Sequence, residues 1–114
     1  MNTTGRVVRI ANQYSPTAIR VDEIGIGAGV VDRLNELKVS NVEGVNVARK
    51  ASRTEQFANL RAELYDGLSE RFIGGQIRIP DDSELISQLA SIKYSFTSSG
   101  QMRFEGKDEL RSRG

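Results

Sequence analysis

Apolar residues recur with different periods along the chain, and each period predicts a different kind of element. In the first part they lie three or four residues apart, which predicts a helix ending at Ser15 and Pro16; its apolar face consists of Val7, Val8, Ile10, Ala11 and Tyr14. Residues 18–21 form a short apolar run typical of a buried strand. A glycine-rich turn at 25–29 leads from this strand into a helix, and residues 42–47 form the next strand. Strand, helix and strand joined by short links predict a parallel βαβ unit.

The clearest predicted helix lies in the middle of the chain. Ser52 with Glu55 three residues later is the pattern of a capping box, in which each side chain bonds a backbone N–H of the first turn. Apolar residues then recur every three or four positions, at Phe57, Leu60, Leu64, Leu68 and Phe72. Gly74 and Gly75 end this stripe, as residues that tolerate a left-handed backbone do.

Short elements follow the long helix. Ile77 and Ile79 alternate with polar neighbours and predict a short strand that Pro80 ends. One of two adjacent aspartates, Asp81 or Asp82, then caps a further helix.

Alternating apolar residues at 92–96 and 102–104, on either side of a polar turn, predict an antiparallel hairpin. Residues 107–113 predict one or two helical turns. Together these elements indicate the α/β class, with a mixed sheet that carries helices on its faces.

Composition limits the chemistry more than it indicates a partner. The 114 residues have the length of a single domain, 1–114, and a net charge of +1, so a nucleic-acid surface would have to be local. The chain has neither cysteine nor histidine, which leaves carboxylates, hydroxyls, lysine and backbone as functional groups. No apolar run is long enough to cross a bilayer, and the first residues lack a signal-peptide core, so we expect a cytoplasmic protein.

Asp22 is the candidate metal ligand and catalytic residue. It follows a predicted strand directly, at the edge of an α/β sheet where ligands bind. A lone carboxylate there suits Mg²⁺ or Mn²⁺, which prefer oxygen ligands, but a two-metal site needs further acids. The alternative is structural, with Asp22 accepting hydrogen bonds from amides of the glycine-rich turn.

The glycine-rich turn also raises a nucleotide-binding alternative. Gly25, Gly27 and Gly29 follow a strand as in a dinucleotide fingerprint, but Val30 stands where a further glycine is required. The acid about 20 residues on, Glu43, lies near the start of the next strand rather than at its end.

Three basic residues, Arg49, Lys50 and Arg53, follow the second strand and are the candidate DNA-binding residues. If the strands are parallel, this cluster lies at the same sheet edge as Asp22. It could bind a phosphate backbone, although many such runs are simply solvated loops.

Several segments in order resemble the nuclease domain of tailed-phage terminase large subunits. They are Ile19-Arg-Val-Asp22-Glu-Ile-Gly25-x-Gly27-x-Gly29-Val-Val-Asp-Arg-Leu34, Gly44-Val-Asn, Phe57-x-Asn59-x-Arg61-Ala-Glu63-Leu-Tyr65, Ile77-x-Ile79-Pro80-Asp-Asp-x-Glu-Leu85, Gln88-Leu-x-x-Ile-Lys-Tyr94 and the closing Lys107-Asp-Glu-Leu-Arg-Ser-Arg-Gly114. The resemblance covers nearly the whole chain.

This resemblance implies an incomplete ribonuclease H-like fold and a two-metal DNA endonuclease of phage genome packaging that uses Mg²⁺ or Mn²⁺. It assigns Asp22 to the acid on the central strand, whereas the family's first and late acids have no counterpart in this chain. We therefore expect an interior part of the domain, from a prophage or a phage, that is inactive alone. By the same resemblance its partners would be DNA, the portal and the small terminase subunit, in the bacterial host cytoplasm.

Absence of the family's early strands would leave a sheet edge open beside residues 18–22, and open edges pair with other copies. We therefore expect self-association, most simply a homodimer. Two other functions stay open from the sequence: a non-enzymatic module that binds DNA or a partner through the basic loop, and a small nucleotide-binding protein that uses the glycine-rich turn.

Overall fold

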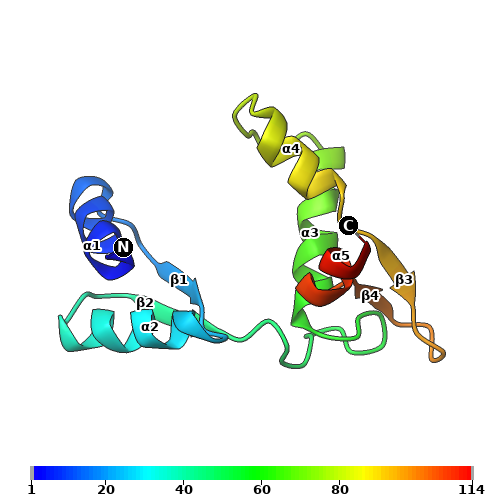
Figure 1. Ribbon diagram of the computed structural model, residues 1–114, viewed down its shortest axis with the longest axis horizontal. Coiled ribbons are helices and arrows are strands. Elements are labelled where there is room, and N and C mark those ends of the chain that lie inside the picture. The colour runs from blue at the N-terminus through cyan, green and yellow to red at the C-terminus, as the bar shows by residue number, and fades with distance from the viewer. Residues whose placement is uncertain (1, 114) are drawn as a thin grey trace. The chain divides into compact units, whose positions relative to one another are not determined.

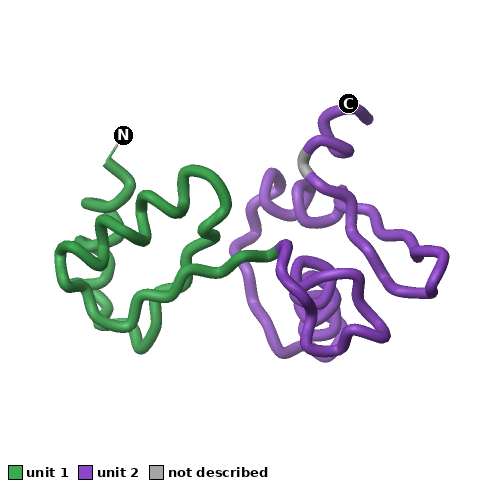
Figure 2. The backbone as a smooth tube through the Cα atoms, turned by 90° about the horizontal axis from the view of Figure 1, so that it is seen from below, with its two compact units in different colours: residues 1–47 green, residues 48–114 purple. Residues whose placement is uncertain are grey.

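The computed structural model describes residues 2–113, except for the side chain of Lys107. The chain divides into two compact units, residues 1–47 and residues 48–114 (Figure 2). A single domain over 1–114 stays a prediction.

The first unit is built on a parallel strand pair (Figure 1). Helix α1 spans Thr3–Tyr14, strand β1 Ile19–Asp22, helix α2 Ile26–Glu36 and strand β2 Val42–Val45. β1 and β2 pair in parallel, in a register that runs from Ile19 opposite Val42 to Asp22 opposite Val45. The predicted βαβ unit is thereby confirmed.

A close approach between backbone groups joins α2 to the end of β1. A Cβ atom on Gly27 would lie 1.6 Å from the carbonyl oxygen of Asp22, so only glycine fits there. Gly27 and Gly29 lie inside α2, which begins at Ile26, so the turn is shorter than predicted; Gly25, with φ of 69°, alone provides the left-handed backbone in it. Leu34 is the fully buried side chain of α2.

The prediction of a buried strand at 18–21 was wrong. Ile19 and Val21 are half-buried, whereas Arg20 and Asp22 are exposed. The reason is that, among residues 2–113, α2 is the one helix that packs on the β1–β2 pair, so a single face of β1 is covered. Side chains alternate between the two faces of a strand, which leaves Arg20 and Asp22 exposed.

The second unit packs a helix against a hairpin. It contains helix α3 Leu60–Ile73, helix α4 Ser83–Ala90, strands β3 Tyr94–Phe96 and β4 Met102–Phe104, and helix α5 Lys107–Arg113. β3 and β4 are antiparallel, which confirms the hairpin, and residues 107–113 are helical as predicted. The N-cap of α4 is Asp82, whose side chain accepts from the backbone N–H groups of Glu84 and Leu85.

The predicted capping box at Ser52 was wrong, because the helix begins eight residues later. Asn59 caps α3 instead, with its side chain 3.0 Å from the N of Ala62. The preceding residues are held by the hairpin: the amide of Ala58 donates to the carbonyl of Met102, and Phe57 forms a parallel bridge with Met102. The predicted end is confirmed, since Gly74 is the C-cap and Gly75 has φ of 67°.

The strand predicted at Ile77 and Ile79 is absent from the described residues, where 76–80 form irregular chain. Alternation shows which face a residue prefers, but a strand also needs a neighbour with which to exchange hydrogen bonds. The core of the second unit consists of Ala51, Phe57 and Ala62 with Met102 and Phe104 packed against them, and the ring of Phe104 stacks on that of Tyr65 at 5.4 Å.

Candidate functional site

Asp22 lies at the carboxyl end of β1, opposite Val45 of β2, with an exposed side chain. Its Oδ1 atom is 3.2 Å from the amide nitrogen of Ile24, which is the structural role considered for it. The next amide, that of Glu23, donates to the carbonyl of Val45 at 3.0 Å and extends the ladder past Asp22. Asp22 therefore occupies the predicted place, at a strand end and next to a parallel strand.

Glu23 is the nearest second carboxylate along the chain, and it is committed to packing. Its side chain lies against Gly44, where a Cβ atom would come within 2.2 Å of the Glu23 Oε2 atom. Among residues 2–113 no three acidic side chains form a group that could hold a metal ion. The described residues thus do not supply the ligand set of a two-metal site, and no catalytic step through a metal is derived for this chain.

The three basic candidates lie in the second unit, on the loop before α3. Arg49 and Lys50 are exposed, and neither has an ion-pair partner within residues 2–113. The carbonyl of Arg49 accepts from the amide of Leu60 at 2.8 Å, which joins the loop to the start of α3. Arg53 differs, because its Nε atom is 3.6 Å from Glu63 and its guanidinium lies 4.9 Å from the ring centre of Phe57.

Glu63 holds this basic loop in place. Its carboxylate accepts three hydrogen bonds: from the amide of Ser52 at 2.9 Å, from the hydroxyl of Ser52 at 2.6 Å and from the amide of Arg53 at 3.0 Å. These bonds lower the pKa of Glu63 from its ordinary 4.5 to about 2, and the bond from the Ser52 hydroxyl has the largest effect. The ionised carboxylate therefore fixes the backbone between Lys50 and α3.

Sequence reasoning missed Glu63 and Asn59 because it paired Ser52 with Glu55. The signal was present: Asn59 is a favoured N-cap residue, and Glu63 falls in the first turn of the helix that it caps. Eleven residues separate Ser52 from Glu63, so no local spacing rule connects them.

A second carboxylate, that of the buried Glu105, joins other segments of this unit. Glu105 is 7% exposed, and its carboxylate accepts from the amide of Lys93 at 2.9 Å and from the guanidinium of Arg113. The hydrogen bond from Arg113 is the main reason that the pKa of Glu105 is lowered. Arg61 of α3 donates to the carbonyl of Glu105 at 3.0 Å, so α3, α5 and the hairpin meet at this residue.

Asp22 and the basic loop belong to different units, so their joint presence at one site stays a prediction. No helix within the described residues is long and apolar enough to span a membrane.

No protein-family model and no curated protein sequence matches this chain. Solved structures do match it. One is the nuclease domain of the large terminase subunit gp2 of bacterial virus Sf6, as the K428A mutant with manganese and beta-thujaplicinol: the TM-score is 0.76 at 17% sequence identity, over 96% of this chain and 63% of that one. The same mutant domain with manganese matches with a TM-score of 0.71 at 17% sequence identity, over 96% of this chain and 64% of that one. The Sf6 nuclease domain, with neither the mutation nor a ligand in its description, matches with a TM-score of 0.70 at 18% sequence identity, over 96% of this chain and 63% of that one.

The fold is therefore like that of the Sf6 nuclease domain, in the α/β class and of the ribonuclease H-like kind, as predicted. Among residues 2–113 the strands form one parallel and one antiparallel pair, β1–β2 and β3–β4, in place of the single mixed sheet that was predicted. This chain spans about 63% of the length of the first of these solved domains. The nucleotide-binding alternative is not favoured, because the close approach of α2 to the carbonyl of Asp22 explains the glycine at residue 27.

Proposed function

We propose that this chain forms part of a phage terminase-type nuclease domain, a metal-dependent DNA endonuclease of genome packaging, and that Asp22 is its metal-binding catalytic acid. The observation that carries the proposal is the position of Asp22 at the carboxyl end of β1, beside parallel β2, in a fold like that of the Sf6 domain. Two of the Sf6 structures contain manganese, which supports Mg²⁺ or Mn²⁺ as the ion in a complete domain.

We infer that the chain alone is inactive. One exposed carboxylate at the strand end leaves most positions around a divalent ion to water, and two-metal hydrolysis needs several acids around ions about 4 Å apart. We expect no tight Mn²⁺ binding by calorimetry and no Mn²⁺-dependent nicking of supercoiled plasmid. Nicking that Asp22→Asn abolishes would show that the chain is a complete nuclease.

The role of Asp22 is tested in a chimera, in which this chain replaces the matching part of the Sf6 nuclease domain. We expect Mn²⁺-dependent nicking that Asp22→Asn abolishes and that the matched Asp32→Asn change, on exposed α2 surface, leaves intact. Equal activity of the unmodified, Asp22→Asn and Asp32→Asn chimeras would show that Asp22 is not a metal-binding catalytic residue. Circular dichroism of each chimera identifies any that fails to fold, and calorimetric Mn²⁺ binding then gives a readout separate from cleavage.

We further propose that Arg49, Lys50 and Arg53 contact the phosphates of DNA. Two observations support this: Arg49 and Lys50 are exposed, and the hydrogen bonds from the amides of Ser52 and Arg53 to Glu63 hold their loop in place. Replacing both Arg49 and Lys50 by Gln should weaken binding of a fluorescent duplex and reduce the slope of log K against log salt by about 2, since each phosphate contact contributes about 0.9. Arg78→Gln, at an exposed site outside the loop, is the control; an equal loss there would refute a specific role for the loop.

Self-association through the open edge of β1 is also part of the proposal, whereas contacts with a portal or small terminase subunit rest on the family resemblance alone. The amides of Ile19 and Glu23 point to β2, so strand alternation directs that of Arg20 to the free edge. Arg20→Pro removes this edge donor without breaking the pairing of β1 with β2. A dimer that dissociates with Arg20→Pro, but not with Arg20→Ala, would support edge pairing.

A further inference from the structure

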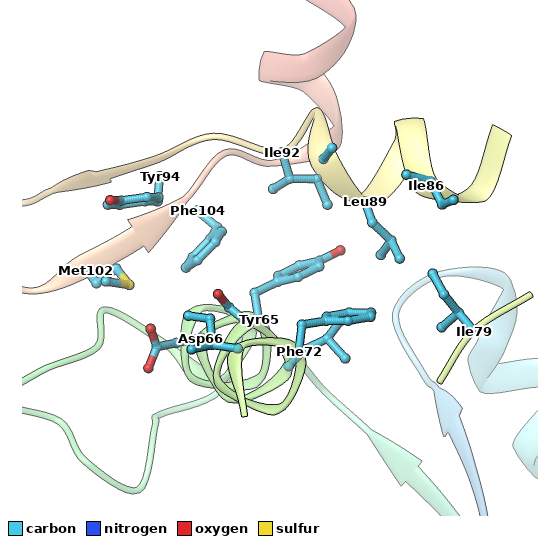
Figure 3. Close-up of a pocket in the computed structure, with 14 residues that line it drawn as sticks. Tyr65, Asp66, Phe72, Ile79, Ile86, Leu89, Ile92, Tyr94, Met102 and Phe104 are labelled. Carbon is cyan, nitrogen blue, oxygen red and sulfur yellow. The ribbon is translucent and has the colours of Figure 1, made fainter. Parts of the chain in front are cut away.

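An open apolar cavity separates α4 from α3 in the second unit (Figure 3). Its volume is about 520 Å³, and no Cα atom of α4 lies within 8 Å of one in another helix or strand of the described residues. Helices in contact normally pack with their axes 8–10 Å apart, so α4 is not packed against α3.

The walls of this α3–α4 groove are mostly apolar on both sides. Leu68 and Phe72 come from α3, Ile86 and Leu89 from α4, and Tyr94 from β3 (Figure 3 labels all but Leu68). Three of these side chains remain exposed, Phe72 at 38%, Ile86 at 44% and Tyr94 at 60%. A hydrophobic groove between two helices is the kind of surface that receives the apolar face of an amphipathic helix.

The same chain carries a helix of this kind in its first unit. Val8 and Ala11 of α1 line a pocket with Leu37, so that side of the helix faces its own unit. Two further apolar side chains of α1 are exposed, Ile10 at 53% and Tyr14 at 70%. Val7, half-buried like Val8 and Ala11, completes with them the i, i+3, i+7 spacing of a groove-binding helix.

Charge matches the two surfaces to each other. Helix α1 carries Arg6 and Arg9 and no acidic residue. The stretch 65–92, which forms most of the groove, contains five acidic and two basic residues: Asp66, Glu70, Asp81, Asp82 and Glu84 against Arg71 and Arg78. Asp66 itself lines the cavity. The opposite net charges of α1 and of this stretch favour association of the helix with this groove.

We propose that the α3–α4 groove binds helix α1 of a second copy of this chain, with Ile10 and Tyr14 inserted between α3 and α4. The groove is a second self-association surface, separate from the edge of β1. It rests on the proposed self-association, but a different set of variants tests it.

The test is sedimentation equilibrium of the full chain from about 1 to 200 μM, at low and high salt. Ile10→Glu and Ile86→Glu each place a charge in the proposed contact, and we expect either to weaken association about tenfold or more. Ile26→Glu, at a 91% exposed position outside both surfaces, is the matched control and should change nothing. All three positions are exposed, so circular dichroism should show folded chains.

Mixing the two weakened variants gives the sharpest result. Ile10→Glu retains an intact groove and Ile86→Glu an intact α1, so an equimolar mixture recovers one complete contact and a larger mean mass than either variant alone. A monomeric wild type, or unchanged association in both variants, would overturn the proposal and leave the groove to another ligand. If Arg20→Pro dissociates the assembly but Ile10→Glu and Ile86→Glu do not, the chain associates through the edge of β1 and not through the groove.

Discussion

The two units of this chain are held together by different means. In the first unit, α2 lies so close to the end of β1 that glycine is required at residue 27, and among residues 2–47 Leu34 is the one large side chain that is fully buried. In the second unit, Glu63 and Glu105 bond backbone groups of other segments around a small core, and Asn59 caps α3. The first unit therefore depends on backbone shape, whereas the second depends on a few polar side chains.

This difference matters for the candidate site. Asp22 is positioned by the parallel ladder and the tight strand-to-helix turn, which fix a strand end rigidly. The basic loop is positioned by one carboxylate, that of Glu63, and by the cap of α3. The comparison predicts that the two candidate regions respond to different substitutions.

Removal of the buried ring in the second unit should have the largest effect. Phe57 is 4% exposed, and Phe57→Ala should destabilise that unit by about 3–5 kcal/mol through the cavity it leaves. Native-state hydrogen exchange should show faster exchange of amides in α3 and β4, with α2 amides little changed. Equal acceleration in both units would show that they unfold together and would end the distinction between them.

A methyl group at Gly27 probes the first unit in the same way. The added Cβ would overlap the carbonyl oxygen of Asp22, and such overpacking costs about 1–3 kcal/mol. Gly29→Ala is the matched control on the same helix: its Cβ meets nothing within 4 Å, so it should stabilise by about 0.5–1 kcal/mol. Urea unfolding followed by circular dichroism measures both, and a destabilised Gly29→Ala with a neutral Gly27→Ala would contradict this account of the turn.

Loss of the α3 cap should have a smaller effect. Asn59→Ala removes the acceptor for the Ala62 amide and should destabilise the second unit by about 1 kcal/mol, as cap removal generally does. Asn59→Asp keeps the acceptor and should retain most of the stability. If thermal unfolding shows the same loss for both variants, the side-chain bond to Ala62 is not the reason.

The pH dependence of Glu63 is the finest test. Its pKa is lowered to about 2 in the folded chain from 4.5, so it stabilises the fold fully above the unfolded value, and this contribution is lost as pH falls from about 4.5 towards 2. The difference in urea midpoint between wild type and Glu63→Gln should therefore be constant at neutral pH and shrink through this acidic range.

Glu55→Gln is the control for that experiment, because Glu55 is exposed and was the partner expected for Ser52. It should leave the midpoint unchanged. A pH-independent difference for Glu63→Gln would show that the carboxylate charge does not hold the loop.

Local patterns in the sequence were sufficient for α1, α2, the hairpin and α4, because each is defined by a period, a cap or a turn within about ten residues. Asp82 shows this well, since its side chain bonds amides two and three residues away. The position of Asp22 at a strand end beside a parallel strand was also predictable, from the strand–glycine–helix–strand order alone.

Contacts between distant residues decided the remaining features. The start of α3 depended on two hydrogen bonds to Met102, more than 40 positions away: one that the amide of Ala58 donates to its carbonyl and one that its amide donates to the carbonyl of Gln56. Local capping rules do not include these bonds, so they could not decide between Ser52 and Asn59 as the cap. The loop carrying Arg49 and Lys50 was visible in the sequence, but its attachment through Glu63 was not. Sequence fixes what each short segment prefers, whereas tertiary structure selects among these preferences, because burial and hydrogen-bond partners come from segments that are far apart along the chain.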